Sequence, residues 1–268
     1  MSPMNNRLLV PRKVPGLLDL VPGAAAAYSL RSLSNSYAGP VVTVRRSSDD
    51  AEADFTAAEV SDGTLAAFCG AGDGFVYRWW DQSGNARHAV AAADTNEPKI
   101  VSSGVVVTEE SKPALQFDGS NDTLAGFSSA LQPASLFAVA NCTLSGNYPS
   151  GRAILGSQTT NQPLAWIENG RWELVRWGQN MSGPVAADGT TNVLSATNSA
   201  STTTVYVNGG DAVTNASGTF VSGSMSIGSA NGTQFFIGKI AEIIVYDRVF
   251  SATERQLVEG NIAWSYSV

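Results

Sequence analysis

Short apolar runs follow one another at a regular spacing from Ala114 to the end of the chain. They are rich in β-branched and aromatic residues and are separated by Gly, Ser, Asn and Asp, which is typical of strands joined by tight turns. The runs are Ala114–Phe117, Leu136–Ala140, Ala153–Leu155, Trp172–Trp177, Thr190–Thr197, Thr202–Val207, Ser224–Ile227 and Phe235–Tyr246. We expect them to form two stacked antiparallel sheets, with Asn208-Gly209 closing a hairpin because both residues tolerate positive φ.

The last strand and the helix that follows it have the clearest signals. Phe235–Tyr246 is apolar on nearly both faces in its second half, so it should lie in the middle of a sheet. Ser251 and Glu254 have the spacing of a capping box, which predicts that a helix begins after Ser251. The apolar face of this helix, which should fold back over the strands, is predicted from Leu257, Val258, Ile262 and Trp264.

The N-terminal half is less regular. The spacing of Ala26, Leu30, Leu33 and Tyr37 predicts a helix over Ala24–Tyr37, which Gly39-Pro40 would end. A short helix is expected over Gly63–Cys69, and a strand over Phe75–Asp81. The glycine-rich stretch Gly70–Gly74 lacks a following Lys-Ser/Thr, so it is expected to be a turn rather than a phosphate loop.

Residues 1–22 are expected to form an extended anchoring arm ahead of a single domain, residues 23–268. Prolines at positions 3, 11, 15 and 22 prevent a continuous helix. The apolar patches Leu8–Val10 and Leu17–Leu20 could dock onto another protein, whereas a frayed terminus is the plainer interpretation.

Charge is distributed unevenly along the 268 residues, whose net charge is −7. Residues 1–46 contain six Lys or Arg against Asp19 alone, which leaves the remainder with 10 basic and 22 acidic residues. An acidic body without a basic groove excludes nucleic acid as a partner of the globular part. Low charge density favours a neutral ligand instead.

Cysteine content and hydropathy limit the possible environments. Cys69 and Cys142 are too few for a zinc knuckle or a disulfide scaffold, and two free buried thiols are expected, although one bridge stays possible. Met1–Arg7 lacks the apolar core of a signal peptide, and no 18-residue apolar run occurs, so neither Sec export nor membrane insertion is expected.

Several residues could carry chemistry. Sugar binding commonly uses an aromatic platform with amide and carboxylate partners. One stretch offers these side chains together, at Trp166, Trp172, Glu173, Trp177, Gln179 and Asn180. For each tryptophan, core packing is the alternative. The loop that contains Asp118, Asn121 and Asp122 could hold a hard cation such as Ca²⁺, or form an Asx-rich turn. His88 is the only histidine and follows a turn, so a structural role is expected.

Two blocks of sequence resemble a known family. Ala27–Arg31 with Gly39–Arg46, and Trp80–Asn85, are similar to the catalytic β-sandwich of fungal-type α-L-arabinofuranosidase B. Ile237–Tyr246 with its following helix resembles the closing unit of laminin-G and concanavalin A-like lectin domains. The resemblance covers roughly residues 19–268 and implies a mainly β fold, a concanavalin A-like jelly-roll sandwich of two antiparallel sheets with a few short helices.

The resemblance also implies which catalytic groups are present. The family's nucleophile, a Glu on a central strand, corresponds to Glu173. The family's acid is an Asp in a turn where this chain reads Gly228–Gly232 and has no carboxylate, and the adjacent cysteine pair of the family is absent. A retaining glycosidase needs both carboxyl groups about 5 Å apart, so we expect the scaffold without hydrolysis. Glu173 could equally form a surface ion pair with Arg171.

Similar domains preceded by short arms occur in bacteriophage tail, fibre and head-surface proteins. The resemblance therefore predicts a virion surface protein, outside the cell after lysis, that is attached to other virion proteins through residues 1–22. The sandwich would bind a host-surface glycan, and a homotrimer is expected only by analogy with fibres. Two alternatives are an active arabinofuranosidase-like hydrolase with an acid recruited from Asp188 or Asp211, and a purely structural decoration protein.

Overall fold

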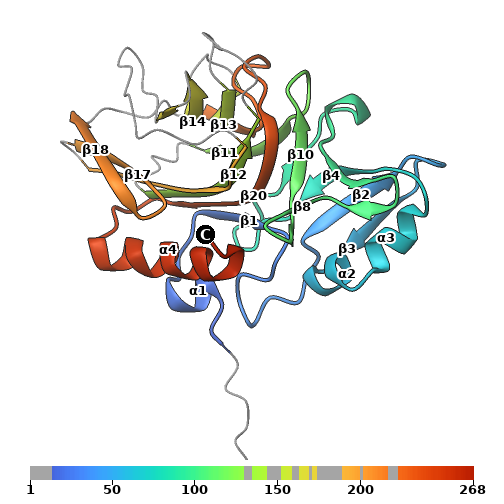
Figure 1. Cartoon of the computed structure of the whole chain (residues 1–268), viewed down its shortest axis with the longest axis horizontal. Helices are drawn as coiled ribbons and strands as arrows, with labels where there is room; N and C mark the ends of the chain where they lie inside the picture. The colour runs from blue at the N-terminus through green and yellow to red at the C-terminus, as the bar shows by residue number, and fades with distance from the viewer. Residues whose placement is uncertain are drawn as a thin grey trace, which may run out of the picture.

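The computed structural model describes residues 14–129, 135–143, 152–158, 163–168, 171–173, 189–199, 202–216 and 223–268. Within these ranges the fold is mainly β, as predicted. Hydrogen bonds join 18 strands into one sheet, in which every described strand pair is antiparallel, and a two-stranded hairpin stands apart. The large sheet curls over itself, so that part of it forms a second layer above the first (Figure 1).

The layers are built from strands that are distant in sequence. The lower layer contains β12 (Ser135–Cys142), β16 (Asn192–Asn198), β17 (Thr202–Val207), β18 (Gly210–Ala216), β20 (Ile237–Tyr246), β1 (Ala26–Ser29) and β10 (Leu115–Asp118). The upper layer contains β11 (Leu124–Ser129), β19 (Gly223–Ile227), β13 (Arg152–Ser157), β14 (Pro163–Glu168) and β15 (Arg171–Glu173). Each predicted run from Ala114 onward coincides with one of these strands, apart from residues 174–177, which lie outside the described residues.

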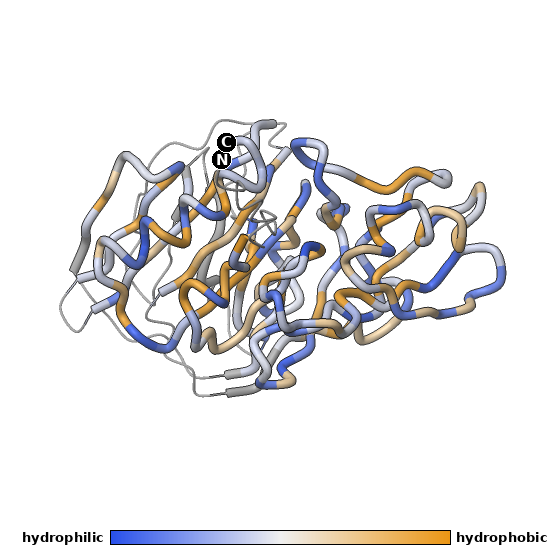
Figure 2. Tube along the Cα trace, turned by 90° about the horizontal axis from the view of Figure 1, so that it is seen from below, coloured by the Kyte–Doolittle hydropathy of each residue, from blue (hydrophilic) through white to orange (hydrophobic). Residues whose placement is uncertain are grey.

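The other half of the molecule joins the two layers at one end (Figure 1). It contains β2 (Val42–Arg46), β3 (Glu52–Phe55), β4 (Gly74–Trp79), β5 (Ala89–Val90), β6 (Lys99–Ser102), β7 (Val105–Val106), the hairpin of β8 (Thr108–Glu109) and β9 (Lys112–Pro113), and three short helices, α2 (Ala57–Ser61), α3 (Thr64–Cys69) and the 3₁₀ helix η1 (Asp94–Asn96). The predicted strand at Phe75 and the predicted short helix at Gly63–Cys69 are both confirmed. Hydrophobic positions run through the interior of both halves (Figure 2).

Strand β20 is central and buried on both faces, as its apolar pattern predicts. Ile243 and Val245 contribute to the core between the layers, whereas Ile244 and Tyr246 face a second cluster beneath the C-terminal helix. β20 pairs with β12 along one edge and with β1 and β10 along the other. The strand therefore links the core of the sandwich to the packing of the helix.

Helix α4 (Ala252–Tyr266) begins with the predicted capping box, because Ser251 Oγ accepts the Glu254 amide and Glu254 accepts the Ser251 amide. Of the four residues predicted to form its apolar face, two are buried and two are exposed. Val258 and Ile262 are buried, but Leu257 is 48% and Trp264 75% exposed. The side that meets the sheet is completed by Arg255, Glu259 and Tyr266. Arg255 and Glu259 form an ion pair there, so buried charged residues occupy helix positions that are usually apolar.

The N-terminal segment differs from its prediction in two ways. Ala26–Ser29 is strand β1 rather than part of a helix over Ala24–Tyr37, because pairing with β20 buries every residue of it. Residues 17–20 form helix α1, whose Leu17 is fully buried with Val21 in the cluster under α4. The extended arm therefore does not include these residues, and an anchoring role stays a prediction for residues 1–13, which lie outside the described residues.

Local details agree with several other expectations. Asn208 and Gly209 have φ of 51° and 73° and close the β17–β18 hairpin. Cys69 and Cys142 are both buried, and no disulfide joins them. No helix in the described part of the chain has the length and apolar character needed to cross a membrane.

Candidate functional site

The motif at Trp80–Asn85, which follows β4, fastens β1 to the rest of the molecule. Asp81 is buried, and its Oδ1 accepts the Ala27 amide at 2.8 Å. Gln82 Oε1 accepts the Leu33 amide, and its Nε2 donates to the carbonyls of Ser29 and Arg31. Every polar atom of the Gln82 side chain is thus used for the backbone. The motif is a structural element of the fold rather than a ligand site.

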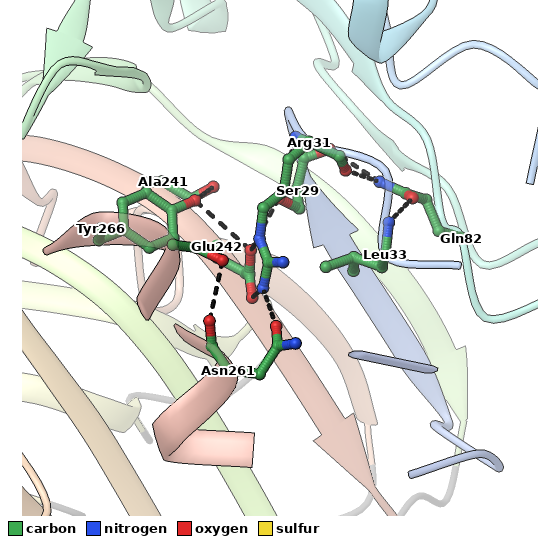
Figure 3. A network of polar contacts seen from close by, with 9 residues as sticks. Ser29, Arg31, Leu33, Gln82, Ala241, Glu242, Asn261 and Tyr266 are labelled. Carbon is green, nitrogen blue, oxygen red and sulfur yellow. Dashed lines mark hydrogen bonds and ion pairs between the residues drawn. The ribbon is translucent and has the colours of Figure 1, made fainter. Parts of the chain in front are cut away.

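A second polar network ties β1 to β20 and α4 (Figure 3). Glu242 on β20 is fully buried, and its carboxylate accepts Arg31 Nε at 2.8 Å, Arg31 Nη2 at 2.9 Å and Ser29 Oγ at 2.8 Å. Arg31 Nη2 also donates to Asn261 of α4. Burial alone would lower the pKa of Arg31, but the Glu242 carboxylate outweighs it, and the pKa is raised.

One face of the upper layer is turned away from the core. Strand pairing places Thr43, Arg78, Val90, Ala125, Ser226 and Gly156 opposite one another, in a single row across β2, β4, β5, β11, β19 and β13. Paired residues share a face of a sheet, and the neighbours Leu124 and Ile227 belong to the core. This row therefore runs along the opposite side, which we call the outer face.

A pocket of about 210 Å³ opens on the outer face. We call it the hydroxyl pocket, and its lining is Ala92, Thr123, Ala125, Gln158, Ser226, Ser229 and Gly232. Thr123 Oγ1 and Ser229 Oγ lie 2.7 Å apart, and Gln158 Nε2 donates to the Met225 carbonyl. Hydroxyl and amide groups thus stand beside the small residues of this lining, and none of its described members carries a carboxyl group.

The rim of the hydroxyl pocket is the turn at Gly228–Gly232, where the family resemblance places an acid. Ser226 Oγ donates to the Ser229 carbonyl at 2.8 Å and holds this turn against β19. Gly228 has φ of 84°, and an added Cβ would lie 2.3 Å from the Phe117 ring. A carboxylate cannot be introduced at this position without displacing the core. Close packing of the backbone of this turn against Phe117 therefore favours glycine at position 228.

The predicted sugar-binding residues are only partly described. Register pairs Ala153 with Trp166 and Trp166 with Glu173, and Ala153 packs against Ala230 of the turn. Positions 166 and 173 therefore lie in a row that starts beside the hydroxyl pocket. The side chains of these two residues, and Trp177, Gln179 and Asn180 altogether, lie outside the described residues.

Trp172 does not offer a stacking surface. It is 1% exposed and belongs to the core between the layers. Core packing, the alternative given for each tryptophan, is therefore correct for Trp172. Its place in the predicted set followed from residue type alone, because a tryptophan on a two-layered sheet alternates between core and outer face with its register. Binding by the other predicted residues stays a prediction.

The loop after β10 has the hydrogen bonds of an Asx turn. Asp118 Oδ1 accepts the amides of Ser120 and Asn121, and Asp122 Oδ2 accepts the amide of Asp118. Among the described residues, no group of three or more His, Cys, Asp or Glu side chains is arranged to hold a metal ion. Burial, with the neighbouring Asp118 charge, raises the pKa of Asp122 to about 7. Calcium binding at this loop stays an untested prediction.

His88 has a structural role in the described residues, as expected. Its Nδ1 accepts the Asp81 amide, and its ring lies 4.5 Å from the Trp80 ring. Burial is the main reason why the pKa of His88 is lowered. The imidazole therefore stays neutral and packed near the motif that holds β1.

Sequence reasoning missed the residues of the hydroxyl pocket. Thr123, Gln158, Ser226 and Ser229 are common residue types without a distinctive spacing. The alternation of Ser224, Ser226 and the intervening Met225 is the one local signal, because it predicts a strand with one polar face. The pocket itself arises only when β11, β13 and β19 pair.

The sequence matches two families. Residues 118–254 match the concanavalin A-like lectin/glucanases superfamily, and residues 19–114 match the catalytic domain of α-L-arabinofuranosidase B. No curated protein sequence matches the chain.

Solved structures share the fold at low sequence identity. A mutant GH54 α-L-arabinofuranosidase soaked with 4-nitrophenyl α-L-arabinofuranoside has a TM-score of 0.69 at 16% identity, over 89% of this chain and 62% of that one. An arabinofuranosidase complexed with arabinofuranosyl-α-1,2-xylobiose gives 0.63 at 16% identity, with 89% and 62% covered. Trypanosoma rangeli sialidase in complex with 2,3-difluorosialic acid gives 0.51 at 14% identity, over 70% of this chain and 31% of that one. The chain thus spans 62% of the arabinofuranosidase chains.

Proposed function

The chain belongs to the concanavalin A-like lectin/glucanases superfamily, and we propose that it binds a neutral glycan in the hydroxyl pocket of its outer face without hydrolysing it. One observation carries this proposal. The described residues that line the pocket contribute hydroxyl, amide and small apolar groups, and none of them carries a carboxyl group. This lining can exchange hydrogen bonds with sugar hydroxyls, and its described side chains include no acid that could protonate a leaving group.

The chemistry of the pocket suits an uncharged, hydroxyl-rich ligand. Ser226 donates its hydroxyl proton to the Ser229 carbonyl, and one proton joins the Thr123 and Ser229 hydroxyls. The three hydroxyls therefore offer chiefly acceptor oxygens, and the Gln158 amide adds an acceptor and the N–H that does not bind Met225. A sugar hydroxyl can both donate and accept. Ala125 on β11 and Gly232 in the turn are small, so they leave room for a sugar ring beside the polar groups. A volume of about 210 Å³ fits the end of a glycan rather than a long enclosed chain.

Hydrolysis would need a second acid near Glu173. Asp211, one of the two alternatives from the sequence, lies on β18 at the far edge of the lower layer. β13, β14 and β15 belong to the upper layer, so Asp211 is not a neighbour of Glu173 in the sheet. Asp188, the other alternative, lies outside the described residues. Loss of a general acid usually lowers the rate by about 10² to 10⁴.

Glycan-array screening followed by calorimetry tests the proposal. Thr123→Val and Gln158→Ala should each weaken binding of a neutral glycan at least about fivefold, because each removes polar partners while keeping the fold. Thr204→Val on β17 is the matched control. Thr204 and Thr214 are hydrogen-bonded to each other on the lower layer, away from the hydroxyl pocket. Absence of binding to every glycan would contradict the proposal and favour a structural decoration role.

A chromogenic arabinofuranoside distinguishes the hydrolase alternative. The proposal expects no turnover above that of buffer. Turnover that disappears in Glu173→Gln would show that the chain is an enzyme and would overturn the binding-only function. A matched Glu52→Gln change on β3, in the other half of the molecule, controls for loss of one exposed carboxylate.

The proposal also includes a place on a virion surface, with the protein attached through residues 1–13. What supports it is composition: this segment holds Arg7, Arg12 and Lys13 with the apolar run Leu8–Val10 and two prolines. Leu17 and Val21 belong to the core, so the test is deletion of residues 1–13 and not of residues 1–22. The truncated protein should fold but fail to enter particles, and normal incorporation would refute the anchoring role.

A further inference from the structure

A larger pocket lies where α4 ends, between the loop after β1 and the β8–β9 hairpin. It has a volume of about 400 Å³, and we call it the helix-end pocket. Its lining includes Arg31, Ser61, Lys112, Trp264, Ser265 and Ser267. Helix α4 packs against the face of β20 that is turned away from the core between the layers, so this pocket and the hydroxyl pocket have no residue in common.

Trp264 is the most exposed large hydrophobic residue of the described chain, at 75%. Val258 and Ile262 hold α4 against the sheet, so Trp264 is not needed for packing of the helix. An exposed indole next to polar groups is the usual platform for a sugar ring, because its flat apolar face covers the C–H side of the ring. Exposure alone does not identify a ligand, but the neighbouring charges do.

Two cations line the same pocket. Arg31 is oriented by the bidentate bond to Glu242 and by Asn261. The bonds to Glu242 and Asn261 use Nε and Nη2 (Figure 3), and Tyr266 also contacts the guanidinium. Arg31 nevertheless lines the pocket and keeps 26% of its side chain exposed. Lys112 is exposed and forms no ion pair with any described residue. The Arg31–Glu242 pair is neutral as a unit, and Lys112 therefore gives the pocket its net positive charge.

The end of α4 adds hydrogen-bond acceptors. The last carbonyl groups of a helix have no partner within the helix, and of those here the Ala263 carbonyl is taken by the amides of Ser267 and Val268. Residues 264–267 line the pocket. A ligand that suits it has hydroxyl donors for the helix end and a carboxylate for Lys112 and Arg31. A simple inorganic anion lacks the first feature, and a neutral sugar lacks the second.

We propose that the helix-end pocket is a second saccharide site, specific for a sugar acid such as a uronic acid residue. The sugar ring stacks on Trp264, and its carboxylate binds between Lys112 and Arg31. Glu242 is a positioning residue, since it acts through Arg31. This site does not depend on the neutral-glycan site of the outer face, because the two sites lie on different elements.

Calorimetric titration with trigalacturonic acid, and with xylotriose as the neutral counterpart, tests the site. The unmodified protein should bind trigalacturonic acid, and Trp264→Ala should weaken this binding about tenfold. Lys112→Gln should remove the preference for the acid over xylotriose at this pocket, whereas Lys112→Arg should keep it. Binding of the acid should also weaken severalfold between about 0.02 and 0.5 M NaCl, because exposed charges are screened.

The controls separate this site from the outer face. Leu257→Ala removes another exposed apolar side chain of α4, at 48% exposure, and should leave binding of the acid unchanged. Gln158→Ala should weaken the neutral glycan but not trigalacturonic acid. The inference is overturned if the acid does not bind, if Trp264→Ala binds it as tightly as the unmodified protein, or if acetate displaces it at equal concentration. If the acid is lost only in Gln158→Ala, the helix-end pocket is not a site while the outer face is.

Discussion

Replacing Glu242 by Gln should destabilise the protein strongly, although one atom of the side chain changes. The carboxylate is 1% exposed and accepts four described hydrogen bonds, from Ser29, twice from Arg31, and from Tyr266. An amide in the same place presents an N–H₂ group to the Arg31 donors and leaves this cation without its partner. Breaking a buried ion pair from one side costs about 3–5 kcal/mol. Arg31 keeps 26% exposure and can recover some hydration, so we expect about 3 kcal/mol, the lower end.

The opposite change should cost more. Arg31→Met leaves the Glu242 carboxylate charged and without its cation at a position that water does not reach, so about 5 kcal/mol is expected. The double variant should be less destabilised than the sum of the two, by at least about 2 kcal/mol. Urea unfolding of the four proteins, followed by tryptophan fluorescence, measures this cycle. Additive effects, or a cost below about 1 kcal/mol for Glu242→Gln, would refute a coupled ion pair between Arg31, in the loop after β1, and Glu242 on β20.

Three further changes test other contacts. Gly16→Ala should destabilise the docking of α1 by about 1–3 kcal/mol in thermal unfolding, because its Cβ would lie 2.4 Å from the Leu33 carbonyl; an unchanged melting temperature would contradict this. Ser251→Ala should cost about 1 kcal/mol. The Glu254 pKa is lowered to about 2, chiefly by the Ser251 amide, so this part of the stability should be complete above pH 4.5 and lost as the pH falls toward 2; denaturation that is insensitive to pH in this window would exclude it. The Asp122 pKa is raised to about 7 by burial, so stability should fall as pH rises from about 4 to 7, and Asp122→Asn should flatten this decline in urea titrations; an unchanged slope would assign it to other groups.

Local signals in the sequence predicted the C-terminal half of the fold. The capping box at Ser251, the Asn208-Gly209 turn and the apolar strand before Tyr246 each depend on residues close together in the chain. For such elements, the conformation that the local residues favour is also the one that tertiary packing requires. The structure therefore confirms them with small shifts of their ends.

The segment from Ala24 to Tyr37 shows why helical spacing of apolar residues led to a wrong prediction of a helix. Ala26 and Tyr28 face the core between the layers, while Ala27 faces the cluster under α4. A strand buried on both sides is apolar at successive positions, and its sequence cannot be distinguished from a buried helix by period alone. The partner that decides, β20, lies more than 200 residues away. Trp264 was misassigned for a related reason, because buried Arg255 and Glu259 occupy the sheet side of α4.

The hydroxyl pocket could not be predicted because its residues meet only after folding. Thr123 precedes β11, Gln158 follows β13 and Ser226 lies on β19. The order of these three strands in the sheet differs from their order in the chain. Single Ser, Thr and Gln residues give no chemical signal. The family resemblance did draw attention to the turn at Gly228–Gly232, which is the rim of the pocket. It did so because the family has an acid in this turn and this chain has none.

The environments of several buried carboxylates limit which acidic residues could act in the hydrolase alternative. Asp81 and Glu242 are both inaccessible to substrate, because backbone amides hold the first and Arg31 holds the second, on the side of the sheet that faces α4. Glu259 is paired with Arg255 and accepts the Ser195 hydroxyl. Asp122 differs, since its pKa is raised to about 7 and it precedes Thr123 of the hydroxyl pocket. An ionisation near neutral pH suits a general acid, so Asp122 is a candidate for this role. If an arabinofuranoside were hydrolysed, Asp122→Asn should reduce kcat as Glu173→Gln does, and turnover that survives Asp122→Asn would place the acid in another part of the chain.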